Sequence, residues 1–393
     1  MNQQHVLSIL IQARIPVMLT GDPGIGKTAQ MEGIAQALDL HLETDIYSGK
    51  APEDVNGLPV LHNNNDNDSS PVSYAAAPSV YRLLKHVGRH GQDNSSLPGE
   101  GGLWFLDEVN QAPEQTQAAL QSAIQDGRFA EVRFDKERFS VVAAGNPVGI
   151  ATNGRELSAP MANRFAHVSW ELDRQYFLKN WSNGFSNPAP VLKLPHDWRK
   201  NLQPSRVLLS AFLERMPQLI HALPKHEAER AGPWPSPRSW DNVSRAFAIG
   251  LSLYDSPMAF QFKELVIPVA SSLVGTGPAS SLLAWMKELS LPSPKEMLAN
   301  PSMPLPFDRP DSIMVAFSSL VAHIISEDNN YDNHCKALDI AIRIKEQKMV
   351  DTIFSSLARL RSKEVVSKMN DARMPVQLME FRSLFESLAK MKT

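Results

Sequence analysis

The first 175 residues alternate between short apolar runs and segments in which apolar residues recur at helical spacing. Apolar runs typical of buried strands occur at 15–20, 40–46, 103–106, 139–144 and 166–172. Helical spacing occurs at 1–14, 29–38, 80–87 and 118–124, and residues 129–139 alternate as a hairpin would. Strands that alternate with helices predict an α/β domain with a mainly parallel sheet.

From about residue 175 the pattern is helical and prolines become frequent. Two proline clusters, 188–204 and 233–237, precede amphipathic segments, and a proline-rich linker at 291–310 interrupts the helical pattern further on. The pattern therefore predicts an α/β domain, an all-helical domain and a helical C-terminal extension, at 1–178, 179–260 and 261–393.

Two further segments have a distinctive composition. The Asn/Asp-rich tract 63–70 cannot bury apolar surface, and it is predicted to be a mobile hairpin tip. The tail carries amphipathic apolar positions that favour a helical core over a docking surface. These positions are Ile340, Ile344, Ile353, Leu357, Leu360, Leu378, Phe381, Leu384 and Leu388.

Composition narrows the class of protein. The 393 residues are 43% hydrophobic and 21% charged, as in ordinary globular proteins, and the net charge of −3 provides no global attraction to nucleic acid. A single cysteine, Cys335, excludes an internal disulfide and a cysteine-based zinc site, and it suits a reducing compartment. The N-terminus lacks the features of a secretory signal, and no long apolar run occurs, so a cytoplasmic location without membrane spans is expected.

A glycine-rich sequence follows the first predicted strand and opens a helix. It fits the pattern G-x-x-x-x-G-K-[ST], which chance produces in on the order of one chain in a hundred. Its glycines let backbone N–H groups converge on an anion, and the helix N-terminus adds partial positive charge. Lys27 is predicted to reach the β- and γ-phosphates, and the Thr28 hydroxyl to ligate Mg²⁺. The predicted nucleotide-binding residues are Gly21, Asp22, Pro23, Gly24, Ile25, Gly26, Lys27, Thr28 and Ala29.

Polar residues follow two later strands at the edge where a nucleotide would lie. Asp107 is predicted to hold Mg²⁺ and Glu108 to polarise the attacking water; the plainer alternative is a solvated acidic turn. Asn146 can hydrogen-bond a γ-phosphate without adding repulsion, although Asn before proline is also common in β-turns.

Two arginines complete the pattern by their order and spacing. Arg164 ends a short helix before a strand, and Arg238 begins a helix in the second predicted domain. A fixed cationic fork stabilises the charge that develops during phosphoryl transfer, in cis or in trans.

In this order the motifs resemble the P-loop AAA+ core: Walker A, Walker B, sensor 1, arginine finger and sensor 2. The finer resemblance, over roughly residues 1–325, is to MoxR-type, dynein-related AAA+ ATPases. It rests on the segments 52–59, 106–113, 143–147, 162–165, 237–240 and 298–306, and on Arg155. Two features depart from that group: the tract 63–70, and Asn163 where many relatives have Asp.

The resemblance implies an assembly and a type of partner. Such proteins form rings, usually hexamers, with ATP between neighbouring subunits. It implies that Arg164 acts on the neighbour's ATP, Arg238 on the ATP of its own subunit, and Arg155 as a second contact in trans. An insertion at about 48–78 would face the ring axis and touch the client, and residues 179–260 would be a lid. Many relatives act as chaperones together with von Willebrand A-domain proteins.

The predicted activity is therefore Mg²⁺-dependent ATP hydrolysis by a ring that remodels or matures a protein client. One alternative is a nucleic-acid motor of the McrB or Holliday-junction helicase kind, although the sequence has no basic run or aromatic–basic stacking face. A second is a nucleotide-dependent switch with little turnover, which the presence of Glu108 disfavours. The 11 histidines show no metal-binding spacing.

Overall fold

The computed structural model describes residues 3–61, 72–147, 149–150, 154–182, 189–254, 260–289, 291–326, 330–357 and 360. The chain forms two compact units, one of residues 1–196 and 220–280, the other of residues 197–219 and 281–393. The predicted hairpin tip 63–70 lies outside the described residues. The predicted division at 178/179 and 260/261 stays a prediction.

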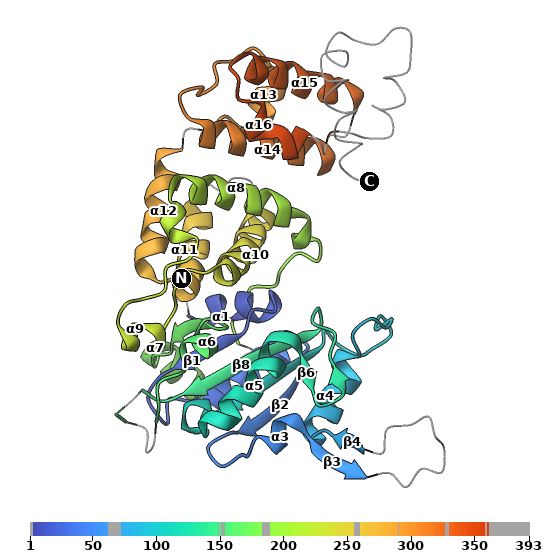
Figure 1. Ribbon diagram of the computed structural model, residues 1–393, viewed down its shortest axis with the longest axis vertical. Coiled ribbons are helices and arrows are strands. Elements are labelled where there is room, and N and C mark those ends of the chain that lie inside the picture. The colour runs from blue at the N-terminus through green and yellow to red at the C-terminus, as the bar shows by residue number, and fades with distance from the viewer. Residues whose placement is uncertain are drawn as a thin grey trace. The chain divides into compact units, whose positions relative to one another are not determined.

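A five-stranded parallel sheet forms the centre of the first unit (Figure 1). Its strand order is β2-β5-β8-β1-β9. The strands are β1 (Val17–Thr20), β2 (His41–Ile46), β5 (Gly102–Asp107), β8 (Phe139–Gly145) and β9 (Ala166–Ser169). The inner strands β5 and β8 are buried almost throughout, as continuous apolar runs require when helices cover both faces of a sheet. The predicted α/β fold with a parallel sheet is confirmed.

Strand register decides which motif residues share an edge of the sheet. Thr20 pairs with Gly145, and Ile46 pairs with Asp107, so the carboxyl ends of these strands lie together. The glycine-rich loop therefore leaves the sheet at the same edge as the residues that follow β5 and β8. This is the edge at which doubly wound sheets bind ligands.

Helices and two small hairpins complete the first unit, and Figure 1 shows α5 in front of the sheet. The hairpins are β3 (Leu58–Leu61) with β4 (Val72–Ala75), and β6 (Arg128–Phe129) with β7 (Val132–Arg133). The helices are α1 (Gln3–Gln12), α2 (Lys27–Ala37), α3 (Glu53–Asn56), α4 (Pro78–Val87), α5 (Glu114–Asp126), α6 (Ala159–Ala162), α7 (Arg174–Trp181), α9 (Glu227–Arg230), α10 (Pro237–Leu253) and α11 (Phe260–Val274).

An aromatic cluster anchors the β6–β7 hairpin to the sheet. The ring of Phe129 lies 4.7 Å from Trp104 of β5 and 4.9 Å from Phe134, which in turn lies 4.9 Å from Phe139. Each such ring pair contributes roughly 0.5–1.5 kcal/mol beyond its buried area. The hairpin predicted at 129–139 is thus present. Its strands are only two residues long, so packing of the aromatic rings contributes more to holding it in place than pairing between the strands.

The second unit is helical and has its own core. Its helices are α8 (Leu202–Arg215), α13 (Pro294–Ala299), α14 (Pro310–Ser326), α15 (Tyr331–Glu346) and α16 (Val350–Leu357), and residues 281–288 of α12 (Thr276–Glu288) also belong to it. The predicted linker at 291–310 contains α13, whose first turn is capped reciprocally by Ser293 and Glu296.

Five of the tail positions predicted to form a core are buried in this unit: Ile340, Ile344, Ile353, Leu357 and Leu360. The other four, Leu378, Phe381, Leu384 and Leu388, lie outside the described residues. In the part of the chain that the structure describes, no helix is long and apolar enough to span a membrane.

Candidate nucleotide-binding site

The loop after β1 has the backbone of a phosphate cradle. Gly24 and Gly26 adopt positive φ angles of 78° and 81°, which a side chain disfavours, and Gly26 is the N-cap of α2. A Cβ atom added at either position would meet no described atom within 4 Å, so the space in front of the loop is open. At Gly21 a Cβ would lie 2.4 Å from the Trp170 carbonyl oxygen, because the loop packs closely against the end of β9. An open glycine loop at a helix N-terminus fits a phosphate group.

Lys27 lies at the centre of this loop and is 91% buried. Its Nζ donates hydrogen bonds to the carbonyl oxygens of Gly21 (2.7 Å) and Asp22 (3.0 Å) and to Oδ1 of Asn146 (2.9 Å). Burial lowers the pKa of Lys27, and the carboxylates of Asp107 and Asp22 oppose that shift. The ammonium is therefore held by neutral oxygens at the position where it could transfer its hydrogen bonds to a phosphate.

Asp107 ends β5 beside the first turn of α2. Its Oδ2 accepts a hydrogen bond from Thr28 Oγ1 at 3.4 Å, and its Oδ1 accepts one from the backbone N–H of Glu108 at 2.9 Å. A hydroxyl and a carboxylate in contact form the type of donor set that holds Mg²⁺ next to a nucleotide. Glu108 itself has φ 55°, a left-handed conformation that is rare outside glycine and that tends to occur at functional sites.

Two asparagines join the ends of β5 and β8. Asn146 accepts the Lys27 hydrogen bond with its side chain, and its carbonyl oxygen accepts one from Asn110 Nδ2 at 2.8 Å. Asn110 is buried, and its Oδ1 has no hydrogen-bond partner among the described residues. A Cβ on Gly145 would lie 2.5 Å from this oxygen, so glycine is required there. Sequence reasoning assigned no role to Asn110, although its place three residues after Asp107 could have indicated one.

A cavity of about 610 Å³ opens beside the glycine loop. It is lined by loop residues, by the start of α1 and by Trp170, Tyr176 and Phe177. Its volume lies within the usual range for pockets that bind small ligands. The aromatic residues after β9 were missed by the sequence analysis; their frequency between 170 and 181 is the signal that could have identified them.

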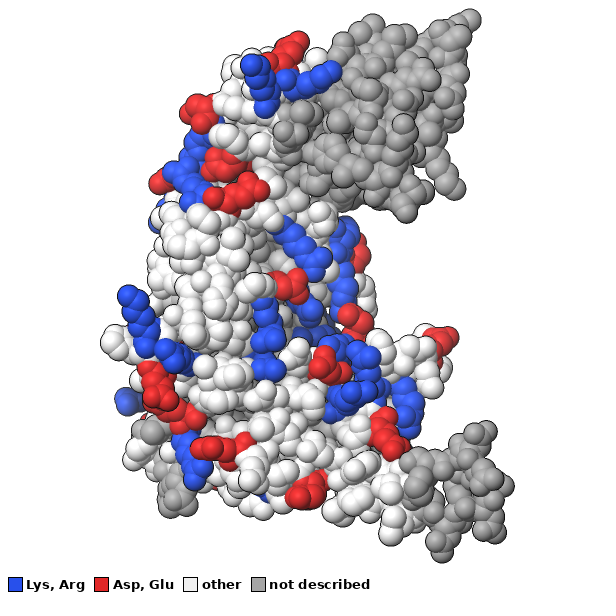
Figure 2. Space-filling model, in the orientation of Figure 1, with Lys and Arg blue, Asp and Glu red and all other residues white. Residues whose placement is uncertain are grey.

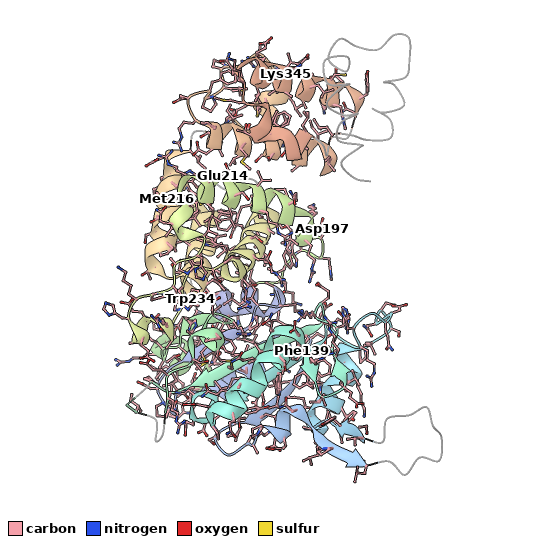
Figure 3. The ribbon with its side chains drawn as sticks, viewed as in Figure 1. Phe139, Asp197, Glu214, Met216, Trp234 and Lys345 are labelled. Carbon is pink, nitrogen blue, oxygen red and sulfur yellow. The ribbon has the colours of Figure 1, made fainter. Side chains whose placement is uncertain are left out.

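Arg164 and Arg238 lie together at the opposite edge of the sheet. They line one pocket of about 280 Å³ together with Pro16, which precedes β1, and Phe139, which begins β8 and is labelled in Figure 3. Since the strands are parallel, this pocket is at their amino ends, whereas the glycine loop is at their carboxyl ends. The expectation that Arg238 acts on its own subunit's nucleotide is therefore not supported by its position.

The two arginines differ in how they are held. Arg164 Nε donates to Gln125 Oε1 at 3.0 Å, and its Nη1 donates to the carbonyl oxygen of Pro160. Burial lowers the pKa of Arg164, and the positive charge of Arg238 lowers it further. Arg238 is exposed and, among the described residues, has neither a hydrogen bond nor an ion pair. The same pocket is also lined by three further cations and two acidic residues: Arg14, Lys136, Arg245, Glu137 and Asp241. On the face that Figure 2 shows, Lys and Arg are interspersed with Asp and Glu.

Arg155 lies apart from the glycine loop and the arginine pocket. Its Nη1 is 3.4 Å from Glu114 Oε1 in an exposed ion pair, and its backbone N–H donates to the carbonyl oxygen of Asn110 at 3.0 Å. The structure thus brings together the loop residues with Asp107, Glu108 and Asn146, and separately Arg164 with Arg238.

Comparison with known proteins identifies a family that part of the chain matches. Residues 16–165 match the AAA domain of the dynein-related subfamily, a range that includes the glycine loop, Asp107 and Arg164. No curated protein matches the chain. One similar solved structure is a candidate ATPase from Cytophaga hutchinsonii, with 15% identity and a TM-score of 0.44 over 71% of this chain and 87% of that chain.

Proposed function

We propose that this chain, whose residues 16–165 form an AAA domain of the dynein-related subfamily, binds and hydrolyses ATP with Mg²⁺ at the loop that contains Lys27. That match confirms the dynein-related AAA+ subfamily predicted from the sequence, and within it we propose the finer MoxR-type assignment. The observation that carries the proposed activity is the contact of three elements: an open glycine loop, the buried Lys27 and the Thr28–Asp107 pair.

Each residue has a distinct role in the proposed reaction. The backbone N–H groups of residues 24–28 would bind the phosphates, and Lys27 would neutralise the β- and γ-phosphate oxygens. Glu108 would orient and polarise the attacking water, and Asn146 would hydrogen-bond the γ-phosphate once Lys27 has turned to the nucleotide. When bound by Thr28 and Asp107, Mg²⁺ would supply neutralisation of phosphate charge.

The arginine pocket supports a ring in which each site is shared by two subunits. β1 and β9 each have four residues and so separate the two edges of the sheet by on the order of 13 Å, more than an arginine side chain spans. We therefore propose that Arg164 and Arg238 both act on the nucleotide of the neighbouring subunit. A contact between opposite edges of identical subunits is heterologous, and such a contact forms a ring when the rotation between subunits closes; we propose a closed hexamer.

A protein client is supported by the β3–β4 hairpin. Leu58, Leu61 and Tyr74 are 61%, 80% and 49% exposed, so the hairpin presents apolar side chains to solvent. It lies within the insertion predicted at 48–78. We propose that it contacts the client, and that a von Willebrand A-domain protein is a partner.

The test is the variant Glu108→Gln, which keeps the size of the side chain and removes its charge. It should bind ATP as the wild type does and lose most of its turnover, since the water is no longer polarised; removal of a catalytic base typically lowers rates by about 10²–10⁴. Glu227→Gln, an exposed glutamate on α9 of the same unit, is the matched control and should keep full activity. Unchanged turnover in Glu108→Gln would remove the catalytic assignment.

A further inference from the structure

A buried polar network joins the segment that carries Arg164 to the segment that carries Arg238. Its central residue is Asn163, which is only 6% exposed. We propose that Asn163 is a positioning residue: its amide fixes the two arginines relative to each other so that both reach one nucleotide. This inference rests on the proposed function, because it assigns Asn163 a part in ATP hydrolysis.

The network consists of hydrogen bonds across 71 to 73 positions of sequence. Asn163 Nδ2 donates to the carbonyl oxygen of Trp234 at 3.0 Å, and Asn163 Oδ1 accepts from Ser236 Oγ at 2.7 Å. Figure 3 shows Trp234 in the segment that leads to α10. Asn163 directly precedes Arg164, and Ser236 is two residues before Arg238. The amide of Asn163 thus connects the segment that carries Arg164 to the segment that carries Arg238.

The same hydroxyl that binds Asn163 also starts the helix of Arg238. Ser236 is the N-cap of α10, and its Oγ accepts from the backbone N–H of Ser239 at 3.1 Å. Ser239 Oγ accepts from the backbone N–H of Ser236 at 2.8 Å and lies 3.1 Å from the Trp234 carbonyl oxygen, to which it can donate. Because a serine has one hydroxyl hydrogen and the Ser236 hydrogen goes to Asn163, Ser236 Oγ only accepts from the start of α10; the Ser239 hydroxyl can donate to the carbonyl oxygen of Trp234 or, at 3.0 Å, to that of Ser236.

Only a side chain that both donates and accepts satisfies this arrangement. An ionised aspartate of the same shape would accept from Ser236 but place a negative oxygen against the Trp234 carbonyl oxygen. Such a buried, repelling pair is unfavourable unless the segments move apart. A neutral amide also adds no negative charge next to the two arginines, so it does not compete with phosphate oxygens of another subunit for them.

The two arginines repel each other, and the negative charge of Asp126, which favours the charged form of Arg164, opposes this repulsion only in part. Both line the same pocket, and the positive charge of Arg238 disfavours the charged form of Arg164. Arg238 is exposed and has neither a hydrogen bond nor an ion pair in the described part of the chain. The helix start therefore determines where the side chain of Arg238 begins, and Asn163 is hydrogen-bonded to that start.

The test compares Asn163→Asp with the wild type and with Asn333→Asp, which introduces the same change at a buried asparagine of the second unit. Asn163→Asp should lower kcat by roughly ten- to a hundredfold, the effect of a misplacement near 1 Å, and leave ATP affinity within about twofold. Asn333→Asp should leave kcat unchanged even where the thermal midpoint falls. Equal kcat in Asn163→Asp and wild type, measured well below the midpoint, would overturn the inference.

A double-mutant cycle separates positioning from general destabilisation. If Asn163 acts through Arg238, the loss of kcat in Arg238→Ala should hardly increase when Asn163→Asp is added; additive losses would overturn the inference. Ser236→Ala, which breaks the same network from the other side, enters the same cycle if Asn163→Asp does not fold. A wild-type ring that retains ATP but never hydrolyses it would overturn the proposed function and this inference together. An active wild type with additive losses overturns this inference alone.

Discussion

Mixing two inactive variants, Lys27→Ala and Arg164→Ala, is expected to restore part of the ATP hydrolysis that each has lost. The first variant lacks the lysine of the glycine loop, and the second lacks an arginine at the opposite edge of the sheet. In a ring built from both, some sites pair an intact loop of one subunit with an intact arginine of its neighbour.

The size of the recovery follows from the geometry of the shared site. On its own, loss of an arginine finger typically lowers the rate by ~10³–10⁵, so the Arg164 variant is nearly silent. The Lys27 variant is silent because it lacks the cation that would neutralise the β- and γ-phosphate oxygens. In an equal mixture a site is complete when the loop comes from the Arg164 variant, with a chance of one half, and its neighbour is the Lys27 variant, also one half. About one quarter of all sites should be active when they act independently.

The assay holds total protein constant and varies the proportion of the two variants while phosphate release is measured. Activity should rise from near zero, pass through a maximum at equal amounts and fall again. Lys27→Ala mixed with Glu108→Gln is the matched control. Both of these lesions lie at the loop edge, so every site in that mixture is defective and no recovery is expected.

Absence of recovery at every proportion, in a mixture shown to exchange subunits, would refute the assignment of Arg164 to the neighbour's site. The same experiment with Arg238→Ala in place of Arg164→Ala tests which subunit's nucleotide Arg238 acts on. Recovery of ATP hydrolysis would support action of Arg238 on the neighbour's nucleotide, as its shared pocket with Arg164 suggests. Absence of recovery would indicate that Arg238 acts on the nucleotide of its own subunit.

Three further predictions concern single residues. Gly26→Ala should destabilise the fold by only roughly 1–2 kcal/mol, because the added Cβ meets no described atom, yet it should weaken ATP binding measurably in a nucleotide titration. Burial raises the pKa of Asp45, but hydrogen bonds from Lys50 and Trp104 hold that pKa below its usual value. The ionised carboxylate therefore contributes to the free energy of unfolding at neutral pH, and this contribution is lost as the pH falls below about 4. In Asp45→Asn the free energy of unfolding should accordingly fall less steeply with acidification. Arg155→Ala should change the unfolding free energy by less than about 1 kcal/mol, since its ion pair is exposed, so any loss of turnover measured at constant stability reports a contact in trans.

Local chemistry explains why the loop edge of the site could be predicted from the sequence. The glycines at 24 and 26 occupy positive φ angles, and Asp107 directly follows a continuous apolar strand, so both roles are encoded within a few neighbouring residues. Parallel pairing then brings such strand ends together without further information. The same logic placed β1, β2, β5, β8 and β9 correctly.

Long-range placement could not be predicted in the same way. Nothing near Arg238 in the sequence indicates that it shares a pocket with Arg164, because that contact depends on the packing of α10 against the sheet domain. Asn163 was noticed only as a departure from relatives, and its hydrogen bonds to residues 234 and 236 span more than 70 positions. Likewise, α13 forms inside a proline-rich stretch because Pro294 occupies the first helical turn, where it is tolerated.

The three hydrogen bonds of Lys27 have a consequence for how a nucleotide enters. An ammonium group has three protons, and in this structure Gly21, Asp22 and Asn146 accept one each. A phosphate oxygen can therefore gain a bond to Lys27 only by displacing one of these acceptors. Nucleotide binding thus exchanges one hydrogen bond of Lys27 for another and does not add one. The lysine stays orientated when no nucleotide is bound, and its net contribution to affinity is the difference in free energy between the hydrogen bond to the phosphate oxygen and the hydrogen bond that it replaces.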